Sequence, residues 1–138
     1  MGMTYLLDTN IVTAIVKKNQ RVNNKLEEVR FLGQEVFISC ITYYEVKRGL
    51  LYANATSQLS AFNGLCRRVG VLFLDDIEII ERASEIHADL KRRGRPIQDA
   101  DILIAATAIT RGLILVSDDS DMLKVPGITV ENWLRTEG

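Results

Sequence analysis

Short apolar runs alternate with helix-length segments along this chain of 138 residues, and that alternation limits its fold most. The runs that we expect to be strands cover 4–7, 35–39, 71–74 and 113–117, with a last short one in "GITVENW". Two helix-length segments separate each of the first four runs from the next. Because buried parallel strands are continuous in Leu, Ile and Val, the pattern predicts an α/β fold with helices on both faces of a central, mostly parallel sheet.

Local signals predict where several helices begin and end. A helix over 22–32 should stop at Gly33, and the helix in "ITYYEVKRGLLYA" has Thr42 as a possible N-cap. In "PIQDADILIAA", Pro96 disfavours helix before it, so Asp99 is expected to cap the helix that follows. Asp101 then lies in its first turn, where the helix dipole favours a carboxylate.

Composition limits the class of protein. With 47% hydrophobic and 25% charged residues, we expect a single domain over 1–138. Seventeen basic against eighteen acidic residues give a net charge of -1, so any nucleic-acid partner must be bound by local patches. The start lacks a signal-peptide pattern and no apolar run approaches a membrane span, so a cytoplasmic protein without membrane contact is expected. Cys40 and Cys66 have no metal-site spacing and are expected to be reduced and buried.

Acidic residues recur where the strands end, which is the edge at which α/β sheets bind ligands. Taken singly, each acid is also explained as a turn former, a helix cap or part of a solvated loop. Together they would repel one another unless a cation bound among them, and oxygen ligands without Cys or His suit Mg²⁺ or Mn²⁺. The acids concerned are Asp8, Glu45, Asp99, Asp101, Asp118, Asp119 and Asp121.

Four motifs in order resemble a known family. They are "YLLDTNIV", "ITYYEVKRGL", "PIQDADILIAATA" and "LILVSDDSDM", and their spacing is similar to that of PIN-domain ribonucleases. The resemblance covers essentially the whole chain and is greatest to VapC-type toxins of type II toxin-antitoxin modules. It implies a three-layer α/β/α PIN-like fold and a Mg²⁺-dependent endoribonuclease that hydrolyses RNA phosphodiester bonds. It also implies a homodimer and inhibition by a cognate antitoxin.

The family's acids match particular positions of this sequence. The first matches Asp8, the second Glu45 and the third Asp101. The fourth lies in a T-x-D or T-x-N motif whose Thr is replaced here by Ser, so Asp119 is our choice and Asp118 the alternative. All four are expected to be metal-binding and catalytic, with Asp8 and Asp101 as principal ligands of Mg²⁺, or of Mn²⁺ in its place.

Other residues have expected roles around this site. The sole histidine, His87, is expected at a helix edge rather than as a general base, and of Tyr43 and Tyr44 at least one should belong to the core. Thr9 and Asn10 are expected to support Asp8 by hydrogen bonds, although turn and capping roles explain them nearly as well. Candidate RNA phosphate contacts are Lys17, Lys18, Lys47, Arg48, Arg67, Arg68 and the run 91–95, each of which a solvated helix end also explains.

Two other functions remain open from the sequence. The chain could be a non-catalytic RNA- or partner-binding module with the same fold, and metal-independent RNA binding would distinguish it. A Mg²⁺-dependent phosphatase of the haloacid dehalogenase kind would need a second Asp two residues after Asp8, where Asn10 stands instead.

Overall fold

The computed structural model describes residues 2–135 and contains alternating strands and helices. The strands are β1 (Thr4–Leu7), β2 (Glu35–Ser39), β3 (Gly70–Leu72), β4 (Ile114–Val116) and β5 (Val130–Glu131). The helices are α1 (Thr9–Val16), α2 (Gln20–Phe31), α3 (Cys40–Tyr52), α4 (Thr56–Arg68), α5 (Ile77–Arg92) and α6 (Asp99–Arg111), with a 3-10 helix η1 (Ser120–Lys124). Two helices lie between each of the first four strands, as the alternation of apolar runs predicts.

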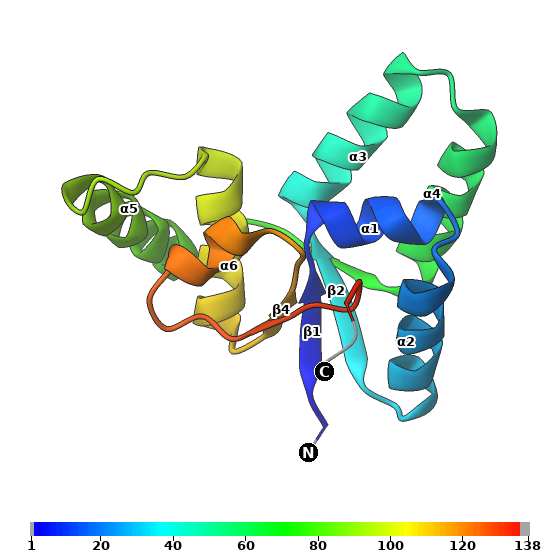
Figure 1. The fold of residues 1–138 in the computed structure, drawn as a ribbon, viewed down its shortest axis with the longest axis horizontal. Helices are drawn as coiled ribbons and strands as arrows, with labels where there is room; N and C mark the ends of the chain where they lie inside the picture. The colour runs from blue at the N-terminus through cyan, green and yellow to red at the C-terminus, as the bar shows by residue number, and fades with distance from the viewer. Residues whose placement is uncertain (1, 136–138) are drawn as a thin grey trace.

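The strands form one parallel sheet in the order β3-β2-β1-β4-β5. Helices α1 to α4 cover one face of the sheet, and α5 and α6 cover the other (Figure 1). The expected three-layer α/β/α fold with a parallel central sheet is therefore confirmed. β1 lies in the middle, between β2 and β4, so its carboxyl end is surrounded by the loops of its neighbours.

Successive residues of β1 point to opposite faces of the sheet and belong to different cores. Tyr5 and Leu7 pack with the buried residues of α1 to α4, whereas Leu6 packs with those of α5 and α6. Both Leu6 and Leu7 are fully buried. Because this central strand is packed on both faces, it holds the residue that follows it, Asp8, in a fixed position.

Two expected helix caps are wrong. Helix α3 begins three residues before the position expected, because Ser39 caps it by accepting from the backbone N–H of Ile41 at 3.1 Å. Helix α6 is preceded by Gln98, whose side chain makes no capping bond, and Asp99 is its first helical residue. Thr42 is instead a buried residue inside α3, where its hydroxyl serves the site described below.

The third strand ends two residues earlier than expected. Ser39 is the last residue of β2 to pair with β3, opposite Leu72, and it then turns into the cap of α3. With no neighbouring strand beyond that point, Phe73 leaves the sheet and is largely exposed. The carboxyl end of β2 therefore sets the length of β3.

The remaining sequence expectations concern membranes and thiols. Within residues 2–135, no helix is long and apolar enough to cross a membrane. Cys40 and Cys66 are free thiols, as expected, but both are only partly buried. Burial raises the pKa of the Cys66 thiol, which disfavours its reactive thiolate.

The close approach of β2 and β3 predicts the effect of a glycine substitution. A Cβ atom at Gly70 would lie 2.6 Å from Cδ1 of Phe37, so Gly70→Ala should lower the free energy of unfolding by about 1–3 kcal/mol. Gly49→Ala is the control, because no described atom beyond the neighbouring backbone of α3 lies within 4 Å of a Cβ there, and a helical alanine should stabilise by about 0.5–1 kcal/mol. Urea unfolding measures both, and equal effects would contradict the close packing.

Candidate active site

Asp8 is a buried acid at the carboxyl end of the central strand, with 2% of its surface exposed. One carboxylate oxygen caps α1 by accepting from the backbone N–H of Thr9 at 2.8 Å. The other accepts from the Ser117 hydroxyl, which follows β4, at 2.6 Å. Burial raises the pKa of Asp8, these hydrogen bonds oppose the rise, and the charges of Asp119 and Glu45 add to it.

Glu45 is bonded to the residue that follows Asp8 through the Thr9 hydroxyl. Thr9 donates from Oγ1 to Oε1 of Glu45 at 2.8 Å, and its Oγ1 also lies 3.1 Å from the hydroxyl of the buried Thr42. The first turn of α1 is thus bonded to the first half of α3. The expected hydrogen bond from Thr9 to Asp8 is made by its backbone N–H, and the Thr9 hydroxyl also bonds Glu45.

Asp101 lies in the first turn of α6 and completes the group from the other side of the sheet. Its pKa is raised to about 6, mainly by burial and then by the charges of Asp8, Asp119, Glu45 and Asp121. Every charge that acts on it is negative, so four separate segments do bring their acids together. Asp99, two residues earlier, is exposed.

In the loop after β4, the adjacent Asp118 and Asp119 have different surroundings. The backbone N–H of Asp119 donates to the Ser117 hydroxyl at 3.0 Å, and the charge of Asp119 acts on both Asp8 and Asp101. This placement favours Asp119 over Asp118 as the fourth acid.

The side chain of Asp118 contacts residues 132–135, which follow β5 and are called the C-terminal segment below. It accepts from Asn132 Nδ2 at 2.6 Å and forms an ion pair with Arg135 at 3.3 Å. Its backbone N–H donates to Oδ1 of Asn10 at 3.0 Å, and Nδ2 of Asn10 lies 3.4 Å from both Asp8 and Ser117. Asn10 therefore ties the two strand-end loops together.

Sequence reasoning missed three of these supporting residues. Thr42 was expected as a cap, and Asn132 and Arg135 had no expected role. Thr42 follows the second strand by only three residues, which places a hydroxyl near the same sheet edge, so its position was a usable signal. Asn132 and Arg135 gave none, because only the fold brings the last strand beside β4.

The acids fit a hard divalent cation by their chemistry. They supply only carboxylate oxygens, and their mutual repulsion is not relieved by any basic side chain among the charges that act on Asp8 and Asp101. Within residues 2–135, no three His, Cys, Asp or Glu side chains already stand close enough to hold an ion. A cation would therefore have to draw the carboxylates closer, and its positive charge would offset the repulsion that, after burial, raises the pKa values of Asp8 and Asp101.

The cations and aromatic residues of α3 fall into two pairs. Lys47 lies over the Tyr43 ring at 5.7 Å and donates to Asn63, on the side that packs against α4. Tyr43 also packs on Phe62, so it is the tyrosine that belongs to the core. Tyr44 is 60% exposed and the Arg48 guanidinium lies 5.0 Å from its ring, so this pair faces solvent. His87 is exposed on α5.

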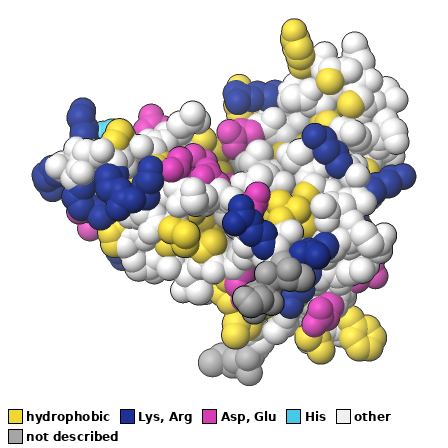
Figure 2. Space-filling view, in the orientation of Figure 1, with side chains coloured by type: hydrophobic (Ala, Val, Ile, Leu, Met, Phe, Trp, Pro, Cys, Tyr) yellow, Lys and Arg dark blue, Asp and Glu magenta, His cyan; other side chains and the backbone are white. Residues whose placement is uncertain are grey.

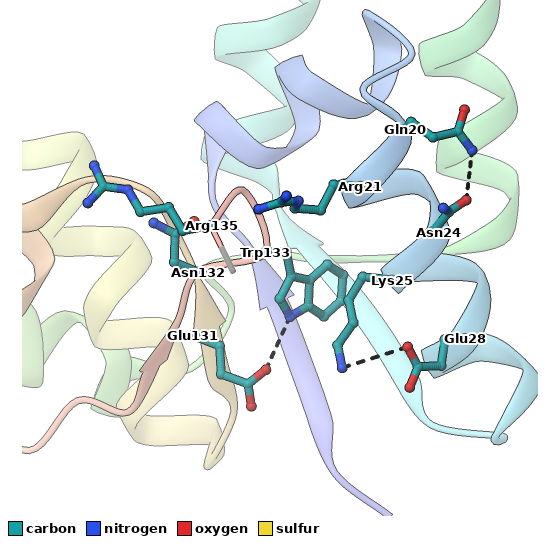
Figure 3. Close-up of a pocket in the computed structure, with 9 residues that line it drawn as sticks. All are labelled: Gln20, Arg21, Asn24, Lys25, Glu28, Glu131, Asn132, Trp133 and Arg135. Atoms are coloured by element: carbon teal, nitrogen blue, oxygen red, sulfur yellow. Dashed lines mark hydrogen bonds and ion pairs between the residues drawn. The ribbon is translucent and has the colours of Figure 1, made fainter. Parts of the chain in front are cut away.

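A pocket of about 650 Å³ lies between α2 and the C-terminal segment (Figure 3). Trp133 forms its floor, where Nε1 donates to Glu131 at 3.1 Å and the ring packs edge-on against Tyr5. Asn132 and Arg135, which hold Asp118, are part of its wall. The lining mixes both charges, with Arg21, Lys25, Glu28, Glu131 and Arg135.

Comparison with known families identifies the family of the chain. A family model described as the PIN domain matches residues 5–128 of the chain. The chain belongs to the PIN-domain family. The resemblance drawn from the four sequence motifs is thereby confirmed.

Relatives of this PIN domain include named ribonucleases. The tRNA(fMet)-specific endonuclease VapC of Salmonella typhimurium is 31% identical over 137 residues, covering 95% of this chain and 98% of that protein. Among solved structures, VapBC2 from Rickettsia felis bound to a promoter DNA fragment matches with a TM-score of 0.87 and 25% identity, covering 95% of this chain and 99% of that one. DNA-bound VapBC from Salmonella typhimurium matches with a TM-score of 0.83 and 28% identity, covering 95% and 98%.

From the acid cluster we predict how the free energy of unfolding of this PIN domain depends on pH when a chelator keeps the protein free of metal. The folded-state pKa of Asp101, about 6, lies above the unfolded value of 3.8, so the folded protein holds this proton more tightly. Its contribution is therefore fully present below about pH 4 and is lost as the pH rises through about 6.

Asp101→Asn should remove this loss and raise the free energy of unfolding at pH 7.5, by no more than about 3 kcal/mol. Asp99→Asn, at an exposed position of the same helix turn, is the matched control. Urea unfolding between pH 4 and 8 measures both variants. A wild-type protein that becomes steadily more stable over this range, with no gain in Asp101→Asn, would contradict the repulsion.

Proposed function

We propose that this chain is a divalent-metal-dependent endoribonuclease and the toxin of a toxin-antitoxin pair, formed by a single PIN domain over residues 1–138. The observation that carries the proposal is the convergence of Asp8, Glu45, Asp101 and Asp119 at the carboxyl edge of the sheet. The similarity to VapC ribonucleases over 95% of the chain supports RNA as the substrate.

In this proposal the four acids form the metal site. Asp8 and Asp101 are the principal ligands, and Glu45 and Asp119 hold a second ion or orient water. Mg²⁺ is the proposed ion, with Mn²⁺ as the alternative, because both prefer carboxylate oxygens. A divalent cation would supply a Lewis acid that lowers the pKa of water and neutralises charge on the scissile phosphate.

Hydrogen bonds within the chain orient two of the proposed ligands, Asp8 and Glu45. The Ser117 hydroxyl and the Thr9 backbone N–H bond opposite oxygens of Asp8, so its carboxylate plane is held in one orientation. The Thr9 hydroxyl does the same for one oxygen of Glu45. Asp8 and Glu45 are thus oriented before a cation draws the carboxylates closer, which lowers the entropic cost of ordering these two side chains.

No protein nucleophile is assigned in this proposal. The sole histidine of the sequence, His87, is exposed on α5 rather than bonded to a serine or an acid of the site. Ser117 donates to the Asp8 carboxylate and accepts from Asp119, so it acts as a positioning residue. Water activated by the cation is the proposed attacking group.

Replacement of Asp101 tests this function directly. Asp101→Asn removes one negative ligand while leaving the helix intact, so Mg²⁺-dependent cleavage should fall by at least about a hundredfold, which removes about 2.7 kcal/mol of transition-state stabilisation. Asp99→Asn should retain cleavage within about threefold, because its side chain is exposed. Cleavage of total RNA followed by sequencing of the new ends is the measurement, with protein freed of antitoxin.

The fold of each variant is checked by circular dichroism. If wild-type protein with Mg²⁺ cleaved no tRNA, rRNA or mRNA, the enzymatic function would be wrong. RNA binding that survives removal of both Asp8 and Asp101 and of the metal would favour a non-catalytic RNA-binding module instead.

Partner proteins are also part of the proposal. Large apolar side chains are exposed on α3 and at the end of α2, and patches of this kind often mark protein interfaces. They are Phe31, Leu32, Tyr44, Leu51 and Tyr52. We assign these surfaces to a cognate antitoxin and to a second copy of the chain, and the two free thiols fit a cytoplasmic protein.

Light scattering tests the partners. The purified chain should have the mass of a dimer, and the product of the adjacent gene should form a complex with it and suppress cleavage. Tyr52→Ser, which changes a side chain that is 90% exposed, should leave the fold intact while weakening one of these assemblies. A chain that stays monomeric and does not bind the product of the adjacent gene would contradict both the antitoxin and the dimer assignment.

A further inference from the structure

A cluster of exposed cations stands at the end of α5, in residues 91–95, "KRRGR", which we call the basic turn. Figure 2 shows Lys and Arg side chains gathered at that end of the molecule, beside the Asp and Glu side chains near the start of α6. All five residues of the basic turn are exposed. Positive and negative surfaces therefore meet at one border of the acid cluster.

The basic turn is held rigidly by backbone bonds and one ion pair. Gly94 takes a positive φ of 68°, which lets Arg95 donate its backbone N–H to Leu90 at 2.9 Å. The Arg93 guanidinium bonds Asp89 at 2.6 Å and the carbonyl of Lys124, in η1, at 3.2 Å. Arg93 thus acts as an anchor, and its charge is already neutralised.

The same anchor connects the basic turn to the acids. Lys124, which Arg93 contacts, forms an ion pair with Asp121 at 2.8 Å. Asp121 in turn donates its backbone N–H to the carboxylate of Asp119 at 2.9 Å. On the other side, residues 96–98 lead directly into α6 and Asp101. Two short connections therefore lead from the turn to the proposed metal site.

Three cations of the turn lack an acidic partner. Lys91, Arg92 and Arg95 form no ion pair with any residue of the described range 2–135. The pocket beside Trp133 differs, because its cations alternate with Glu28 and Glu131 and Arg135 is paired with Asp118. The basic turn is thus a surface near the acids that suits a chain of phosphates.

We propose that the basic turn binds backbone phosphates of the RNA strand next to the bond that is cut, through Lys91, Arg92 and Arg95. The inference rests on the proposed function and adds a substrate-binding site to it. A protein with a net charge of -1 cannot attract RNA by its overall field, so a local patch must offset the repulsion of the acids. Such contacts would set affinity and register rather than base sequence.

A matched pair of variants tests the proposal. Arg92→Gln with Arg95→Gln removes two cations of the turn. Arg67→Gln with Arg68→Gln removes two exposed cations at the end of α4, which leads into the start of β3 and so lies at the edge of the sheet opposite the acids, against their sequence-based candidacy as phosphate contacts. Both pairs lie at helix C-termini and carry the same charge, so the helix dipole affects them equally. Binding of a fluorescent single-stranded RNA is measured by anisotropy in EDTA, over a range of KCl concentrations.

The turn variant should bind about tenfold more weakly at low salt, and its slope of log affinity against log salt should fall by about 1.4, since each lost phosphate contact removes about 0.7. The α4 variant should stay within about twofold of wild type. Equal losses in the two variants, or no loss in either, would overturn the proposal. So would a turn variant that keeps its RNA affinity but loses its affinity for the antitoxin.

Cleavage in Mg²⁺ is measured on the same proteins and keeps the two claims apart. If wild-type protein cleaves RNA, the turn variant should show a raised KM that added salt no longer changes strongly, with kcat within about threefold. If wild-type protein binds RNA through the turn and cleaves none, the turn is supported and the proposed function is contradicted.

Discussion

The buried carboxylate of Asp8 is the interaction on which the rest of the site depends. It stands at the end of the central strand, caps α1 through Thr9 and accepts the hydroxyl of Ser117 from the neighbouring strand. One side chain therefore joins three elements and also brings a charge into the interior. Burying a charge in this way is costly, and the raised pKa of Asp8 reflects that cost.

The other acids increase this electrostatic cost. Glu45, Asp101 and Asp119 reach this edge from elements that pack on opposite faces of the sheet. Burial, together with the charges of Asp8, Asp119, Glu45 and Asp121, raises the pKa of Asp101 to about 6. A structure that concentrates like charges gives up stability in exchange for affinity for a counter-ion. The proposed metal site and the proposed basic turn both follow from this, because a cation must enter and a polyanion must still approach.

Much of the fold could be predicted from the sequence because its signals are local. The runs at 4–7 and 35–39 have the bounds of β1 and β2, since a strand buried on both faces is rich in apolar residues at its centre. The helix caps were less predictable. Ser39 caps α3 in place of Thr42, and α6 begins at Asp99 itself, after Gln98, whose side chain makes no capping bond. Such positions are hard to predict because several polar residues compete and their local propensities differ little.

The sequence by itself determined the alternation of strands and helices, the residues that must be buried, and the set of acids at strand ends. Only the tertiary structure decided which acids meet. Asp118 and Asp119 are adjacent and chemically identical, yet Asn132 and Arg135 hold one outward while the loop directs the other to Asp8. Those partners follow β5, whose place beside β4 depends on long-range packing that no local pattern of residues encodes.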